Sequence, residues 1–153
     1  MNTKRILICG HRAFSAHGLC DLLAEKGHRV TQFSRGELRC ENNTVTGDVC
    51  QIHQNPFFTD NVDTVINYIV LKFESIDRNM AYLKSLLQFC NDKKVNHLIH
   101  ISSVSVYPDS TRILTEDAPI KTDPATCGAY AGIKVATEVY LMKHLPADLQ
   151  LTL

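Results

Sequence analysis

Apolar and polar residues along the chain follow two alternating patterns. A short continuous apolar run, typical of a strand buried on both faces of a sheet, occurs at 6–9, and further strands are expected at 30–33, 44–46, 62–68, 97–101 and 149–153. Apolar residues at helical spacing lie between them, at 13–27, 76–90 and from Tyr130 onward. Residues 51–58 are a weaker helical candidate because Pro56 interrupts them, and the proline-containing stretch 108–126 indicates an irregular loop.

Alternation of strands and helices predicts right-handed crossovers and a parallel sheet. The expected fold is therefore α/β, a doubly wound parallel sheet of the Rossmann-like kind, in one domain over residues 1–153. Such sheets bind ligands at the carboxyl ends of their strands. One bound molecule could touch the five residues at the predicted strand ends, which are Gly10, Ser34, Asp48, Asn67 and Ser103.

Composition narrows the class of protein. Sixteen basic and sixteen acidic residues cancel without long runs of either sign, so a nucleic-acid partner is not suggested. No apolar stretch approaches the roughly 20 residues of a membrane span, and no secretory signal is evident. Six scattered cysteines without a Cys-x-x-Cys pair are expected to be reduced, and the seven histidines show no metal-binding spacing. A soluble, cytoplasmic protein without a metal site is expected.

The main candidate for chemistry is the pair Tyr130 and Lys134, one helical turn apart on one face. A free tyrosine has a pKa of about 10, and an ammonium within ~4–6 Å lowers it by favouring the phenolate. Such a tyrosine can pass a proton while a hydride moves, and Ser103 could hold the substrate oxygen. Alone, the spacing occurs often by chance, and it then indicates an ordinary helix with a surface lysine and a half-buried tyrosine.

The first strand-to-helix turn has the place where a dinucleotide pyrophosphate meets a helix N-terminus. Gly10 is present, but Ala13 and Ala16 occupy the later two small positions. The methyl group of Ala13 could crowd the phosphate or require a positive φ, which only glycine adopts cheaply. Arg12, Ala13 and Phe14 are expected cofactor contacts. The alternative is an ordinary β–α turn, which could have a similar sequence without binding a cofactor.

The end of the second strand bears on the choice of cofactor. An acidic residue there would bind ribose hydroxyls and repel a 2′-phosphate, but the chain has Ser34 followed by Arg35. Because guanidinium groups pair bidentately with phosphate, Arg35 and Arg12 favour NADP over NAD. The alternative is that both arginines are merely solvated.

Together these residues resemble the extended short-chain dehydrogenase/reductases, the NAD(P)-dependent sugar-nucleotide epimerase/dehydratase group, over nearly the whole chain. The first turn resembles a worn Gly-x-x-Gly-x-x-Gly loop. The other similar segments are Gly47-Asp48-Val49 (the adenine-side aspartate), Ile99-His-Ile-Ser-Ser-Val-Ser-Val-Tyr107 (the strand with the catalytic serine), Thr115-Glu-Asp-Ala-Pro119, Tyr130-x-x-x-Lys134 with Glu138, and, more softly, Asn79.

The resemblance implies that Tyr130 is the acid/base, that Lys134 holds the nicotinamide ribose and lowers the tyrosine pKa, and that Ser103 orients the substrate. It implies hydride transfer at a hydroxyl or carbonyl carbon, with a nucleotide-linked sugar as the expected substrate. The expected cofactor contacts are Gly10, Arg12, Ala13, Phe14, Ser34, Arg35, Asp48, Val49, Asn67, Tyr130 and Lys134. A homodimer through helices at 73–91 and 127–144 would also follow.

Departures from the family pattern leave an alternative open. Ile133 stands where the family has a small polar residue, and the glycine loop is degraded. In addition, the substrate-binding region that follows the sixth strand in family members is absent. The chain is then a fragment or a natural truncation. A non-catalytic NAD(P)-binding or regulatory module fits Ala13 and the missing region, whereas the intact Ser103, Tyr130 and Lys134 favour an enzyme. A third possibility, an RNA-associated protein of the same fold, has little support because the net charge of the chain is neutral.

Overall fold

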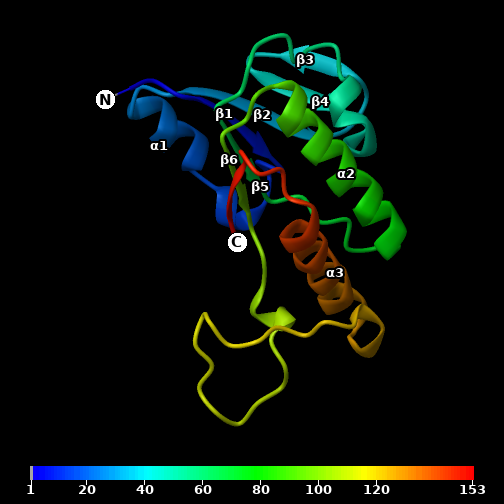
Figure 1. Cartoon of the computed structure of the whole chain (residues 1–153). Helices are drawn as coiled ribbons and strands as arrows, with labels where there is room; N and C mark the ends of the chain where they lie inside the picture. Colours follow the sequence, from blue (N-terminus) through cyan, green and yellow to red (C-terminus); the bar gives the residue numbers. More distant parts are fainter. Residues whose placement is uncertain (1) are drawn as a thin grey trace.

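The computed structural model describes residues 2–153 and confirms the α/β fold (Figure 1). Seven strands form one sheet in the order β3-β4-β2-β1-β5-β6-β7, parallel except for β3. The strands are β1 (Arg5–Cys9), β2 (Arg29–Arg35), β3 (Arg39–Glu41), β4 (Thr44–Gly47), β5 (Thr64–Asn67), β6 (His97–His100) and β7 (Gln150–Thr152). The strand order reverses between β1 and β5, which makes this point the expected ligand site.

Helices cover the two faces of the sheet unequally. In Figure 1, α1 lies on one side of the strands, and α2 and α3 lie on the other. The α-helices are α1 (Leu19–Glu25), α2 (Ile76–Asp92) and α3 (Ala129–His144), and short 3-10 turns are η1 (Phe14–Ala16), η2 (Val49–Gln54), η3 (Val104–Val106) and η4 (Pro124–Thr126).

The apolar run of strand β1 follows from the burial of both of its faces. Leu7 and Cys9 belong to the main core, which packs against α2 and η2, whereas Ile6 and Ile8 face the smaller cluster beneath α1. Alternate residues of a strand point to opposite faces, so a doubly covered strand must be apolar at every position. In the main core, the ring of Phe58 makes edge contacts with Phe33 and Phe89 at centroid distances of 5.7 and 5.0 Å.

The first helix differs from the sequence-based expectation. A helix was expected from residue 13, but only η1 forms there, and α1 begins at Leu19 after Gly18 adopts φ +74°. Glycine is a weak helix former and takes the left-handed region freely, so it separates the turn from the helix. The prediction of an α-helix from residue 13 is therefore wrong for residues 13–18.

An antiparallel hairpin between β3 and β4 was not predicted. Its two-residue turn consists of Asn42 and Asn43, with φ of +46° and +62°. Positive φ at both turn residues is what a tight two-residue hairpin of type I′ requires. All three residues of β3 are exposed, so they carry no apolar signal. The remaining strands and α2 and α3 agree with the expected ranges to within a few residues.

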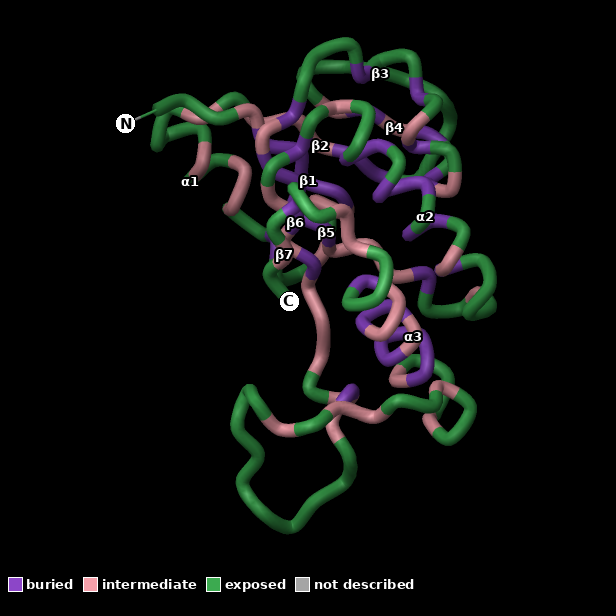
Figure 2. The backbone as a smooth tube through the Cα atoms, in the orientation of Figure 1, coloured by how far each residue is buried: buried purple, intermediate pink, exposed green. Residues whose placement is uncertain are grey.

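Residues 108–126 are irregular, as predicted, except for the 3-10 turn η4, and the mostly exposed chain of this loop extends away from the body of the protein (Figure 2). All six cysteines are free thiols, two of them buried in the core. In residues 2–153, no helix has the length and apolar character to cross a membrane, and no cluster of side chains suited to a metal ion is found.

Candidate active site at the strand carboxyl ends

A cleft of about 560 Å³ lies where the parallel strands end, between the first turn and α3. Its walls come from the turn after β1, the end of β2, the segment after β5 and the start of α3. Eight of the twelve site residues expected from the sequence line it: Gly10, Arg12, Ala13, Phe14, Arg35, Val49, Tyr130 and Lys134. Ser34, Asp48, Asn67 and Ser103 do not.

Gly10 makes the wall of the cleft beside β5 possible. Its φ is +81°, and a Cβ at this position would lie 3.0 Å from the side chain of Ile69 and 3.2 Å from that of Tyr68. Both the backbone conformation and the close approach of the next strand therefore require glycine. Ala13, in contrast, has φ −62° and needs no glycine, so the strain considered for that position does not arise.

The charge of the cleft is positive. Its lining includes four cationic side chains, Arg12, Arg35, Lys72 and Lys134, and no carboxylate among the residues that the structure describes there. Guanidinium and ammonium groups form strong hydrogen bonds with phosphate oxygens. The cleft is thus suited to a ligand with several phosphate charges.

Lys134 is buried in the first half of α3, with 4% of its surface exposed. Its Nζ donates a 2.6 Å hydrogen bond to the carbonyl oxygen of Ile101, just after β6. Burial lowers the pKa of Lys134, and the charge of Lys72 lowers it further, while Glu138 acts in the opposite direction. Because an ammonium has three N–H groups, this contact leaves donors for a ligand.

Tyr130 lies at the mouth of the cleft with 37% of its surface exposed. Lys72 Nζ lies 5.6 Å from the centroid of its ring, within the range of a cation–π contact. Sequence reasoning missed Lys72. The signal was its place shortly after a predicted strand, at the edge where the other site residues were expected.

The two serines after β6 have different partners. Ser102 lines the cleft, and its hydroxyl donates to Oε1 of the buried Glu138. Ser103 lies beside the cleft as the N-cap of η3, where its Oγ accepts hydrogen bonds from the backbone nitrogen and hydroxyl of Ser105, at 3.2 and 3.0 Å. The predicted role of Ser103 toward a substrate stays a prediction.

Asn67 lies behind the cleft, fully buried, rather than in it. Its amide nitrogen donates to Nδ1 of His100 at 2.9 Å, and its oxygen accepts from the hydroxyl of Tyr82 at 2.6 Å. Burial, aided by the charge of Lys134, lowers the pKa of His100 to about 3, so the imidazole is neutral. Asn67 therefore ties β5 to β6 and α2.

Two buried polar atoms near the cleft have no hydrogen-bond partner among the described residues, His11 Nδ1 and Ser34 Oγ. His11 follows Gly10 in the lining turn, and Ser34 precedes Arg35 at the end of β2. Unpaired buried polar groups are rare in folded proteins and call for an explanation. A ligand in the cleft would supply one. His11 was missed because a single histidine in a turn carries no pattern.

Two residues expected on the adenosine side of the cofactor, Arg35 and Asp48, already form ion pairs within the protein. Arg35 Nη1 contacts Glu74 Oε1 at 2.7 Å, and Asp48 Oδ1 accepts from the backbone nitrogen of Cys50 at 2.9 Å and lies 3.4 Å from Arg78 Nη2. The expectation of NADP relied on a free Arg35. Because its guanidinium is already paired with a carboxylate, the structure does not support that preference.

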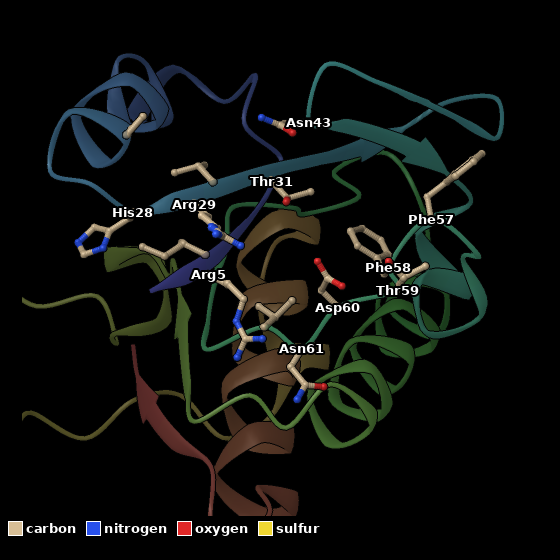
Figure 3. Close-up of a pocket in the computed structure, with 14 residues that line it drawn as sticks. Arg5, His28, Arg29, Thr31, Asn43, Phe57, Phe58, Thr59, Asp60 and Asn61 are labelled. Atoms are coloured by element: carbon tan, nitrogen blue, oxygen red, sulfur yellow. The ribbon is translucent and has the colours of Figure 1, made fainter. Parts of the chain in front are cut away.

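A second hollow, of about 490 Å³, lies at the opposite end of the strands (Figure 3). It is lined by the starts of β1 and β2 and by the segment from Phe57 to Val62. Arg5 at its edge forms a two-pronged pair with Asp63, at 2.8 and 3.2 Å. None of the residues expected to carry chemistry lies there, so the first cleft is the candidate active site.

Comparison with known families assigns the chain to a protein family. The model of the NAD dependent epimerase/dehydratase family matches residues 6–148, so the chain belongs to that family. This confirms the resemblance inferred from the first turn, the serine strand and the Tyr130 helix. No curated protein matches the chain.

Solved structures of similar fold include sugar-nucleotide epimerases. The UDP-glucose 4-epimerase from Bifidobacterium longum, in complex with NAD+ and UDP, is 22% identical with a TM-score of 0.72 over 91% of this chain and 48% of that chain. The Bordetella bronchiseptica enzyme WbmG, in complex with NAD and UDP, is 15% identical (TM-score 0.75; 98% and 52%). The UDP-N-acetylglucosamine 4-epimerase from Methanobrevibacter ruminantium M1 is 20% identical (0.70; 99% and 54%). The chain therefore spans about half the length of these proteins.

Proposed function

We propose that this chain forms the dinucleotide-binding and proton-transferring part of an NAD-dependent enzyme acting on a nucleotide-linked sugar, of the epimerase, dehydratase or reductase type. The observation that carries the proposal is the meeting of Tyr130, Lys134 and the Gly10 turn in one positively charged cleft. Family membership and neighbours solved with NAD and UDP support the same class.

The residues fit a dinucleotide in three respects. The described lining of the cleft has cations and no carboxylate, Gly10 with φ +81° allows the tight turn that forms its wall, and His11 Nδ1 and Ser34 Oγ are buried without partners among the described residues. Arg12 would bind the pyrophosphate, and Ser34 and His11 would hydrogen-bond the adenosine side. NAD, when bound, would supply the hydride acceptor and donor.

The protein's own contribution is proton transfer and orientation. Tyr130 would take the proton from the sugar hydroxyl oxygen as the carbonyl forms, and return it when the carbonyl is reduced. Lys134, fixed by its hydrogen bond to Ile101, would hold ribose hydroxyls one helical turn from Tyr130. Ser103 would orient the substrate oxygen, and its present contacts with Ser105 set its position.

One observation favours a second candidate, a non-catalytic NAD-binding module. Ser103, the residue expected to orient the substrate, does not line the cleft, and its Oγ accepts hydrogen bonds from Ser105. A module of this kind would bind NAD in the same cleft without converting any sugar.

The test uses purified protein, NAD+ and either UDP-glucose or UDP-N-acetylglucosamine. The enzyme proposal predicts NAD binding by calorimetry, product formation seen by chromatography, and loss of product but not of binding in Tyr130→Phe. Binding without conversion of either sugar would favour the module. Failure to bind NAD would contradict both.

A further inference from the structure

We propose that Glu74 sets the preference of the cleft for NAD over NADP, by holding Arg35 and placing a carboxylate where a 2′-phosphate would have to bind. The inference rests on the proposed function and names a specificity-determining residue for it. Arg35 ends β2, the strand whose end distinguishes the ribose of NAD from that of NADP in doubly wound folds. It is the arginine that a 2′-phosphate would use.

The contact between the two side chains is close. Arg35 Nη1 lies 2.7 Å from Glu74 Oε1, and the other carboxylate oxygen of Glu74 lies 3.4 Å from Arg78 Nε. Arg78 in turn lies 3.4 Å from Asp48. Two arginines and two carboxylates therefore form a balanced chain across the ends of β2 and β4 and the start of α2. The positive charge of Arg35 is already matched.

The backbone that carries Glu74 is fixed by a buried asparagine. Asn79 accepts from Leu71 N at 2.9 Å and donates to Leu71 O at 3.1 Å and to Ser75 O at 3.0 Å. The nitrogen of Glu74 also donates to Leu71 O, at 3.1 Å. The turn between β5 and α2 thus fixes the backbone of Glu74, so only side-chain entropy is lost when its carboxylate meets Arg35.

This arrangement acts differently on the two cofactors. A 2′-phosphate brings close to two negative charges, so it must compete with Glu74 for Arg35 and is repelled by the carboxylate. NAD has a neutral hydroxyl at that position and meets neither obstacle. Because both side chains are partly exposed, water and salt weaken the effect, and we expect a change of about tenfold in NADP affinity rather than complete exclusion.

Calorimetric titration of the protein with NAD and with NADP tests the inference. The wild type should bind NAD more tightly, and Glu74→Gln should tighten NADP about tenfold while leaving NAD nearly unchanged. Adding Arg35→Gln to Glu74→Gln should abolish the gain. Glu74→Ala, which should behave as Glu74→Gln does, provides a second variant, and thermal unfolding checks that each is folded.

Asp77→Asn is the matched control. Asp77 is exposed in the first turn of α2 and has no ion pair among the described residues, so its loss changes the net charge equally without freeing Arg35. Its NADP-to-NAD ratio should equal that of the wild type. An unchanged ratio in both Glu74 variants, or tighter wild-type binding of NADP than of NAD, would overturn the inference alone. Wild-type binding of neither cofactor would overturn the proposed function as well.

Discussion

The Nζ of Lys134 in α3 donates a 2.6 Å hydrogen bond to the backbone carbonyl of Ile101, which follows β6. This contact joins the helix that carries Tyr130 to the strand that leads to Ser103. Two segments about 30 residues apart in sequence are thereby held at the same cleft. A buried lysine with a single backbone partner is costly unless its remaining donors are used, which a bound ribose would do.

Tyr130→Phe should reduce turnover of a sugar nucleotide by about 100-fold or more, the range of general acid–base contributions, and leave the NAD dissociation constant nearly unchanged. The ring and its contact with Lys72 remain, while the exchangeable proton is lost. Steady-state rates and calorimetry measure the two effects. Tyr107→Phe, which removes a hydroxyl bonded to the carbonyl of Glu116, is the control and should keep the activity. Equal rates for the two variants would refute the role of Tyr130.

Gly10→Ala should destabilise the fold more than Gly27→Ala. Both glycines have φ near +80°, so both variants bear a left-handed penalty of about 1–2 kcal/mol. Only at Gly10 does the added Cβ meet neighbours, at 3.0 Å from Ile69, whereas nothing lies within 4 Å at Gly27. Urea denaturation gives the two free energies of unfolding. NAD binding should weaken in Gly10→Ala and not in Gly27→Ala. Equal losses of stability in the two variants would contradict the predicted clash between the added Cβ and Ile69.

Ala13→Gly should not tighten NAD binding. Ala13 already has an ordinary backbone conformation, with φ −62°, so glycine relieves no strain there and adds flexibility to the unfolded chain. Calorimetric titration of the wild type and the variant compares the affinities. A large gain in affinity would show that the methyl group crowds the phosphate.

His100 should make the fold sensitive to acid. Its pKa is about 3 in the folded protein and 6.5 in the unfolded reference, so the unfolded state binds more protons between these values. The free energy of unfolding should therefore fall as pH decreases from about 6.5 toward 3, by at most about 1.4 kcal/mol per pH unit from this residue. His100→Gln should flatten the dependence measured by urea denaturation.

His97→Gln provides the matched control for that experiment. His97 lies on the same strand but is only half-buried and contacts Thr152. Its replacement should leave the acid sensitivity in place. The same slope in the His100 variant as in the wild type would assign the acid sensitivity to other groups.

The sequence was sufficient to predict the sheet, the helices α2 and α3, and eight residues of the cleft, because apolar periodicity reports burial and strand ends converge in a parallel sheet. It could not show that Arg35 is paired, since Glu74 lies 39 positions away and surface ion pairs leave no pattern. The start of α1 was misplaced because Gly18 was read as part of a helix. The hairpin of β3 was missed because its strand is exposed, although Asn42 and Asn43 carried a turn signal.

Thermal unfolding of the protein with increasing NAD is the most direct test of the central claim, that the cleft at the strand ends is a dinucleotide site. A ligand that binds only the folded state at ~100 times its Kd adds roughly 2.7 kcal/mol of stability. The account predicts a saturable rise in Tm with NAD that is lost in Gly10→Val. The same Tm with and without NAD in the wild type would contradict it.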